Sequence, residues 1–192
     1  MKRKLILASA SLRRQELLLL CNIPFEIQVS NTNEVIDTSL PLGIAIEDVA
    51  TQKGRDIFSR NPEALVLGAD TIVTVDNEIL GKPKDADDAR RMIKLLSGKT
   101  HKVITGVCFM SKEETRVFHT STEVTFKEMS SKEIEQYIAT DEPYDKAGAY
   151  ALQGRASLYI TGIKGDYYTV IGLPVNRVYE YLLELGYYRL MK

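Results

Sequence analysis

Short apolar runs alternate with segments of helical periodicity along this chain of 192 residues. Near the start, "KLILAS" has the composition of a buried strand, and "PFEIQVS" that of a second strand. Between them, residues 12–21 carry apolar side chains at Leu17, Leu18 and Cys21, a spacing that predicts a helix. A second helix is expected over residues 42–59, where the apolar positions again fall near one face.

The middle of the chain predicts a hairpin followed by a further helix. In "ALVLGADTIVTVDNEILG", two apolar runs flank Asp76 and Asn77, a pair that suits a tight turn. Asp85 is a suitable N-cap for a helix that continues to Leu96, and Gly98 is a suitable stop signal after it.

Four strands and two more helices are expected in the rest of the chain. "HKVITGVCFMS" and "TRVFHTSTEVTFKEM" both have strand-like composition, and Ser130 with Glu133 forms a capping box for a helix. "RASLYITGIKGDYYTVIGLP" predicts two strands around a turn at Gly165. A last helix is expected to begin at Pro174 and to end at Gly186.

The alternation of strands and helices predicts an α/β fold. Because no linker, internal repeat or low-complexity tract interrupts it, residues 1–192 are expected to form a single domain. The net charge of −1 provides no broad basic field for nucleic acid, so a bound anion would need a local cluster of cations. The apolar run at the start is too short for a signal peptide, and no run approaches a membrane span, so a cytoplasmic location is expected.

Side chains that often ligate metals or act as nucleophiles show no such pattern here. His101 and His119 have no partner at metal-ligand spacing, and we expect both to be non-catalytic. Cys21 and Cys108 lie among apolar neighbours, which favours buried, reduced thiols. The chain also has no nucleophile elbow with an ordered serine, acid and histidine.

A departure from the local rules lies where the first helix should begin, in "ASASLRRQELL". Acidic residues are usual in the first turn of a helix, but this turn carries Arg13 and Arg14. Two cations there cost stability unless an anion lies beside them. A serine-rich turn with two guanidiniums suits the oxygens of a phosphate, and orientation of both arginines into solvent explains the pattern equally well.

A second departure is Asp70, which interrupts the apolar run "LVLGADTIVTV". A buried carboxylate is costly unless it meets a cation, a metal or several hydrogen-bond donors, so we expect a functional role. The alternative is a β-bulge at Gly68 and Ala69 that turns the carboxylate to the surface.

Two further charged side chains are expected to lie near this carboxylate. Lys82 ends the second strand of the hairpin and would lie beside Asp70, although a surface ion pair of little energetic value is the alternative. Glu34 lies in a polar segment that could loop towards Asp70, whereas a solvated glutamate is the default. Two carboxylates together with phosphate oxygens commonly hold Mg²⁺.

The stretch "DEPYDKAGAYALQG", Asp141–Gly154, is a candidate functional loop. It combines acids, a lysine, glycines and a glutamine in the connection between a helix and a strand, where functional residues are frequent. Its small residues around Gly148 indicate that another group approaches the backbone closely.

Six segments together are characteristic: "LILASASLRRQELL", "GADTIV", "ILGKPKD", "LSGKTHKVITGV", "EPYDKAGAYALQG" and "GDYYTVIGLPV". In their order and spacing they resemble the signatures of the Maf family of nucleotide pyrophosphatases, over essentially the whole chain. The resemblance implies an α/β fold similar to the inosine-triphosphate pyrophosphatases, with a mixed central sheet flanked by helices and a cleft between two lobes. It also implies hydrolysis of a nucleoside triphosphate to the monophosphate and pyrophosphate with a divalent metal cation, Mg or Mn, and a homodimer.

Members of this family differ in base preference: one branch takes dTTP and UTP, and another takes 7-methyl-GTP. The resemblance implies the first branch, because its three specificity positions match Arg13, Thr71 and Gln153 here. It also implies that Asp70 is the proton acceptor. The alternatives are the 7-methyl-GTP branch and a non-enzymatic regulator of cell division, the role behind the family's older link to septum formation.

The residues and the resemblance together predict attack of water on the α-phosphorus. In this hypothesis Glu34 and Asp70 hold the metal, and Asp70 takes the proton from the water. Lys82, Arg14 and Lys53 neutralise the leaving pyrophosphate, because phosphoryl transfer depends mainly on positioning and charge stabilisation. The other side chains expected to bind the nucleotide, besides the specificity positions, are Ser9, Ser11, Asp145 and Lys146.

Overall fold

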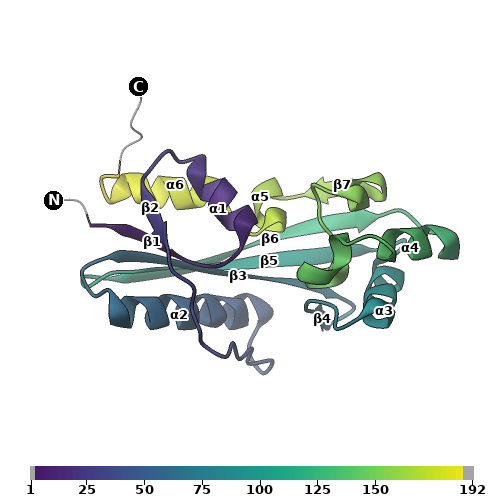
Figure 1. Ribbon diagram of the computed structural model, residues 1–192, viewed down its shortest axis with the longest axis horizontal. Helices are drawn as coiled ribbons and strands as arrows, with labels where there is room; N and C mark the ends of the chain where they lie inside the picture. Colours follow the sequence, from purple (N-terminus) through teal and green to yellow (C-terminus); the bar gives the residue numbers. More distant parts are fainter. Residues whose placement is uncertain (1–2, 188–192) are drawn as a thin grey trace. The chain divides into compact units, whose positions relative to one another are not determined.

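The computed structural model describes residues 3–187, which form a sheet flanked by helices (Figure 1). The strands are β1 (Leu5–Ala8), β2 (Phe25–Ile27), β3 (Leu65–Val75), β4 (Glu78–Leu80), β5 (Thr100–Met110), β6 (Thr115–Phe126) and β7 (Ile160–Lys164). The α-helices are α1 (Leu12–Leu19), α2 (Leu42–Arg60), α3 (Ala86–Leu96), α4 (Ser131–Ile138), α5 (Tyr167–Ile171) and α6 (Val175–Glu184). The short 3₁₀ helices are η1 (Glu142–Asp145), η2 (Ala147–Ala149) and η3 (Arg155–Leu158). Across residues 3–187, no helix is long and apolar enough to cross a membrane.

The sheet is mixed, which confirms the predicted α/β class. In the described residues it has seven strands in the order β2-β1-β3-β5-β6-β7, with β4 paired to β3. Strand β1 runs parallel to both β2 and β3, whereas β4 is antiparallel to β3 and β7 is antiparallel to β6. The parallel part is the strand–helix–strand arrangement expected from the start of the sequence.

The chain divides into two compact units. Unit 1 consists of Met1–Asp70, Thr105–Thr120 and Gly172–Lys192, and unit 2 of Thr71–Ile104 and Ser121–Ile171. Three of the boundaries fall inside β3, β5 and β6, so each of these strands contributes residues to both units. The single domain, the cleft and the similarity to the inosine-triphosphate pyrophosphatases stay predictions.

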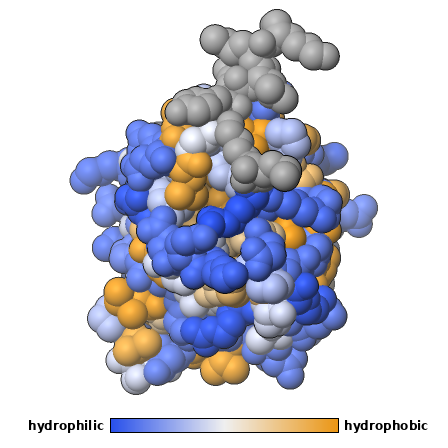
Figure 2. All heavy atoms as spheres, turned by 90° about the vertical axis from the view of Figure 1, so that its left-hand side faces the viewer, coloured by the Kyte–Doolittle hydropathy of each residue, from blue (hydrophilic) through white to orange (hydrophobic). Residues whose placement is uncertain are grey.

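In unit 1, helix α2 lies along one face of the strands, and α1 and α6 lie on the other side (Figure 1). The face of α2 predicted to be apolar is buried, as Ile46, Val49 and Ile57 have no exposed surface. These side chains of α2 are thus inside, and the face in Figure 2 is mostly hydrophilic, with hydrophobic residues in small groups.

Two glycines allow α2 to approach the strands more closely than any other residue would permit. A Cβ added to Gly68 would lie 2.4 Å from the Ala50 carbonyl oxygen, and one added to Gly106 would lie 2.4 Å from that of Ile46. Since both obstacles are helix backbone, a side chain at either position would push α2 away from the sheet. This close approach allows side chains of α2 to reach residues of β3.

Unit 2 contains the turn and the helix caps that the sequence predicted for this part of the chain. Asp76 and Asn77 form the turn between β3 and β4 with positive φ angles of 49° and 65°, as a type I′ turn requires. The Asp85 carboxylate accepts a hydrogen bond of 2.8 Å from the Asp88 N–H and caps α3. Ser130 and Glu133 form the predicted capping box of α4.

Two expectations on the elements need correction. The strand expected in "PFEIQVS" is shorter and comprises only Phe25–Ile27. The second strand expected after Gly165 is wrong, because this segment forms α5. The Asp166 carboxylate accepts hydrogen bonds from the N–H (2.8 Å) and the hydroxyl (2.7 Å) of Thr169, so a side-chain cap overrides the strand propensity of "YYTVI".

His101 is buried in the apolar core of unit 2. Its Nε2 atom is 2.7 Å from the Tyr150 hydroxyl, with which it shares a hydrogen bond, and its ring contacts Phe126 edge-on. Its Nδ1 atom has no hydrogen-bond partner among the described residues. Burial lowers the pKa of His101 from its ordinary value of 6.5 to about 4.

We expect this histidine to make the protein less stable in mild acid. Above pH 6.5 the His101 ring is neutral in both the folded and the unfolded protein. Between pH 6.5 and about 4 only the unfolded chain takes up a proton at this ring. The free energy of unfolding should therefore fall by about 1.4 kcal/mol per pH unit, or about 3 kcal/mol in total. Urea denaturation at several pH values would measure this slope. His101→Gln should reduce it, and an unchanged slope in the variant would contradict the assignment.

Candidate active site

Asp70 meets a cation, one of the partners expected for a carboxylate in an apolar strand. Its side chain is 16% exposed, which contradicts the alternative of a carboxylate turned to the surface. The ammonium of Lys53 on α2 donates a hydrogen bond of 2.6 Å to Asp70 Oδ1. Lys53 is itself only 9% exposed, because α2 places it on the buried face of the helix.

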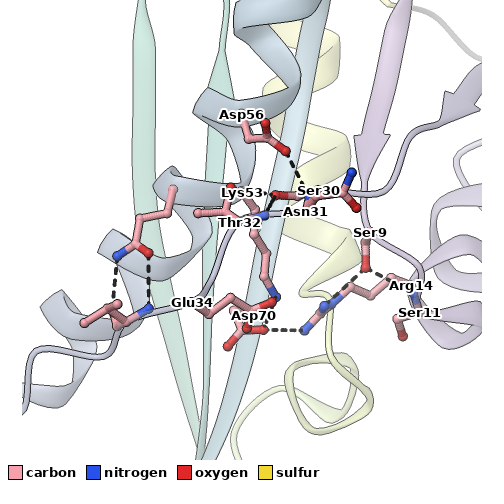
Figure 3. Close-up of polar contacts among 12 residues, drawn as sticks. Ser9, Ser11, Arg14, Ser30, Asn31, Thr32, Glu34, Lys53, Asp56 and Asp70 are labelled. Atoms are coloured by element: carbon pink, nitrogen blue, oxygen red, sulfur yellow. Dashed lines mark hydrogen bonds and ion pairs between the residues drawn. The ribbon is translucent and has the colours of Figure 1, made fainter.

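Glu34 reaches the same ammonium from a different segment of the chain (Figure 3). Its Oε1 atom is 2.9 Å from Lys53 Nζ, and its side chain is 46% exposed. The polar segment after β2 therefore loops towards Asp70, as expected. The carboxylates of Asp70 on β3 and of Glu34 on the loop therefore both pair with the Lys53 ammonium.

Arg14 provides a second cation at Asp70. Its NH2 group is 3.9 Å from Asp70 Oδ1, and its Nε donates a hydrogen bond of 2.8 Å to the Gly172 carbonyl. Burial lowers the pKa of Arg14, and the charge of Asp70 opposes that shift, while an arginine stays charged at neutral pH. The anion that a cation in the first turn of α1 requires is therefore Asp70.

The serines before α1 have different roles. Ser9 is buried, and its hydroxyl accepts hydrogen bonds from the Ser11 N–H (3.2 Å) and from Arg14 NH1 (3.3 Å). Ser11 is the N-cap of α1, but its side chain makes no capping hydrogen bond. The two arginines also differ, because Arg14 is buried whereas Arg13 is partly exposed.

The loop Asp141–Gly154 lies in unit 2 and is internally bonded. The Lys146 ammonium pairs with the Asp145 carboxylate and donates a hydrogen bond of 2.8 Å to the Glu142 carbonyl. A Cβ added to Gly148 would lie 3.0 Å from the Val73 side chain, and the φ angle of Gly148 is +71°. The predicted close approach at this glycine is thus confirmed, and the group that approaches it is a core valine.

The structure brings together only part of the predicted site. The members within unit 1 that contact one another are Ser9, Ser11, Arg14, Glu34, Lys53 and Asp70. Unit 2 carries Thr71, Lys82, Asp145, Lys146 and Gln153, of which Lys82, Asp145 and Gln153 are exposed. Their assembly with the unit 1 residues, including the expected approach of Lys82 to Asp70, stays a prediction.

Two features of the site were missed from the sequence. Lys53 was expected to neutralise the leaving pyrophosphate, and its direct pairing with Asp70 was not predicted. A signal was present, since Lys53 follows Val49 by four positions and precedes Ile57 by four, which places it on the buried face. The Gly172 carbonyl that holds Arg14 had no signal, because the two lie 158 positions apart.

The donor set fits a divalent cation only in part. Within residues 3–187, no group of three or more histidine, cysteine or acidic side chains could hold a metal ion. Glu34 and Asp70 do supply carboxylate oxygens at one point, and Mg²⁺ characteristically combines one or two carboxylates with phosphate oxygens and water. A divalent cation at this point would have to take its remaining ligands from phosphate oxygens and water.

Comparison with known proteins finds similar sequences over nearly the whole chain. Residues 4–185 match the family described as Maf-like protein. A relative from Bacillus cytotoxicus is 54% identical over 177 residues, which cover 92% of this chain and 92% of the relative. Two relatives from Bacillus cereus strains are 49% identical over 176 residues (92% of each chain) and 48% identical over 184 residues (96% of each chain). All three are named dTTP/UTP pyrophosphatase.

Proposed function

This chain belongs to the Maf family, and from that premise we propose that it hydrolyses dTTP and UTP to the monophosphate and pyrophosphate. The observation that carries the proposal is the convergence of Glu34 and Asp70 on Lys53, with Arg14 beside them. Buried cations next to carboxylates suit a triphosphate, whose oxygens need both positive charge and a metal. The names of relatives about half identical to this chain support the choice of nucleotides.

Asp70 is the proposed proton acceptor for the water that attacks the α-phosphorus. In the described residues both Lys53 and Arg14 contact its Oδ1 atom, so we assign the proton to Oδ2. The two cations hold the carboxylate in one orientation. A positioned base of this kind contributes about 10²–10⁴-fold to a rate.

Glu34 and Asp70 are the residues that would hold a divalent cation, Mg or Mn, in this proposal. Such a cation supplies Lewis-acid polarisation of the phosphate oxygens. The side chains of Lys53, Arg14 and Lys82 neutralise the charge that develops on the leaving pyrophosphate.

The remaining side chains bind and select the nucleotide in this proposal. Ser9 and Ser11 donate hydrogen bonds to the phosphates from the turn before α1. Asp145 and Lys146 complete the set of side chains around the phosphates or the metal. Recognition of the base is assigned to three specificity positions, on α1, on β3 and after η2: Arg13, Thr71 and Gln153.

A nucleotide panel tests the proposed function. With Mg²⁺ or Mn²⁺ present, pyrophosphate release should be faster for dTTP and UTP than for 7-methyl-GTP by at least about tenfold in kcat/KM. A preference for 7-methyl-GTP would assign the chain to the other branch of the family. Absence of release from every nucleotide would favour the non-enzymatic role in cell division.

A further inference from the structure

The segment that carries Glu34 has no secondary structure of its own. Residues 28–37 form neither helix nor strand. Within the described part of the chain, residues 29–36 make no backbone-to-backbone hydrogen bond. A segment of this kind samples many conformations unless side chains hold it, because backbone entropy opposes order. In the ion pair between Glu34 and Lys53 the glutamate side chain is 46% exposed, and such a pair alone holds a loop weakly.

Gln52 on α2 holds the backbone of the residue next to Glu34. Its side-chain oxygen accepts a hydrogen bond of 3.3 Å from the Val35 N–H, and its side-chain nitrogen donates one of 3.0 Å to the Val35 carbonyl. Both polar backbone groups of one residue are thus paired by one amide, as in a strand ladder. The same nitrogen donates to Asp48 (2.8 Å), which fixes the orientation of the amide.

Asp56 holds the beginning of the same segment, close to Ser30 and Thr32 (Figure 3). Its Oδ2 atom accepts a hydrogen bond of 3.1 Å from the Asn31 N–H, and Arg60 pairs with it at 2.8 Å. Asp48, Gln52 and Asp56 are four positions apart and therefore lie on one side of α2. The helix that carries Lys53 also carries the groups that fasten the loop of Glu34.

We propose that Gln52 is a positioning residue, which fixes the backbone at Val35 so that the Glu34 carboxylate stays beside Lys53 and Asp70. The proposal rests on the proposed function only in giving Glu34 a part in hydrolysis. The attachment of the loop can be measured on the protein without any nucleotide. A group displaced by about 1 Å can lower a rate by as much as 10²-fold, so loss of the attachment should reduce turnover more than binding.

The first measurement is backbone hydrogen exchange in Gln52→Ala without nucleotide. Alanine keeps the helix, and the exchange of residues 30–36 should become faster by about tenfold because the Val35 N–H loses its acceptor. Gln136→Ala, the same change at an exposed position of α4, is the control and should leave this segment unchanged. Unchanged exchange in Gln52→Ala would overturn the proposal.

The second measurement separates positioning from a general loss of structure. In Gln52→Ala, kcat for dTTP should fall about tenfold while KM changes less than about threefold. In a Glu34→Gln background the same substitution should have less than about a twofold further effect, because the group it positions is already lost. An equal effect in both backgrounds would overturn the proposal. If the wild-type protein hydrolyses no nucleotide, the proposed function fails, whereas faster exchange around Glu34 would still support the attachment.

Discussion

Asp70→Asn should lower kcat for dTTP hydrolysis by about 10³-fold, within the range expected for loss of a general base. The amide has the shape of the carboxylate but cannot take the proton from water. It also leaves Lys53 and Arg14 without the charge that both contact. Since these cations are buried, the variant should lose about 2 kcal/mol of stability as well. Steady-state pyrophosphate release measures the first effect, and urea denaturation measures the second.

The matched control for this variant is Asp76→Asn. Asp76 lies in the turn between β3 and β4, is 62% exposed, and pairs with Lys99 at 2.6 Å. Asparagine tolerates the positive φ angle of this position, and a surface ion pair contributes little, so turnover should stay within about twofold. Undiminished turnover in Asp70→Asn would contradict its role as proton acceptor. An equal loss in both variants would show that the effect is not specific to the site.

Gly68→Ala should destabilise the protein by about 3 kcal/mol, because the new Cβ would meet the backbone of α2. That atom would lie 2.4 Å from the Ala50 carbonyl oxygen and 3.0 Å from the Gly54 nitrogen. Relief of the overlap requires movement of α2, which carries Lys53 and the loop attachments. We therefore expect activity to fall in the molecules that remain folded. Urea denaturation with an unchanged m-value would report the loss as a change in stability.

Gly81→Ala provides the comparison for a glycine without close neighbours. A Cβ added to Gly81 would have no atom within 4 Å, and its φ angle is not positive. The free energy of unfolding of this variant should change by less than about 1 kcal/mol, because alanine meets no neighbour and only restricts the unfolded chain. A similar loss in both variants would contradict the close packing of α2 as the cause.

The elements that the sequence predicted correctly depend on contacts between near neighbours in the chain. The caps of α3 and α4 and the turn at Asp76 involve atoms within a few residues of one another. The buried face of α2 follows from a repeat of apolar residues over several turns. The strand expected at α5 was wrong because a segment of five residues is too short for its apolar pattern to distinguish a helix from a strand. The cap from Asp166 instead determines that this segment is helical.

The candidate site could be predicted as a set of residue types, but not as a set of partners. The sequence by itself determined that a buried Asp70 needs a cation, a metal or several hydrogen-bond donors, because an ionised carboxylate in an apolar strand is too costly alone. It also determined that two cations at the start of α1 cost stability unless an anion lies beside them, because the helix terminus is already positive.

Only the tertiary structure decided which charges meet. The glycine at position 68 lets α2 approach β3, and so Lys53 became the partner of Asp70. The Gly172 carbonyl, distant in the chain, selects Arg14 as the buried arginine of the pair. The physical reason is that the cost of burying a charge can be judged from one residue and its neighbours. The group that offsets this cost depends on packing between segments, whose separation along the chain carries no information about their distance in space.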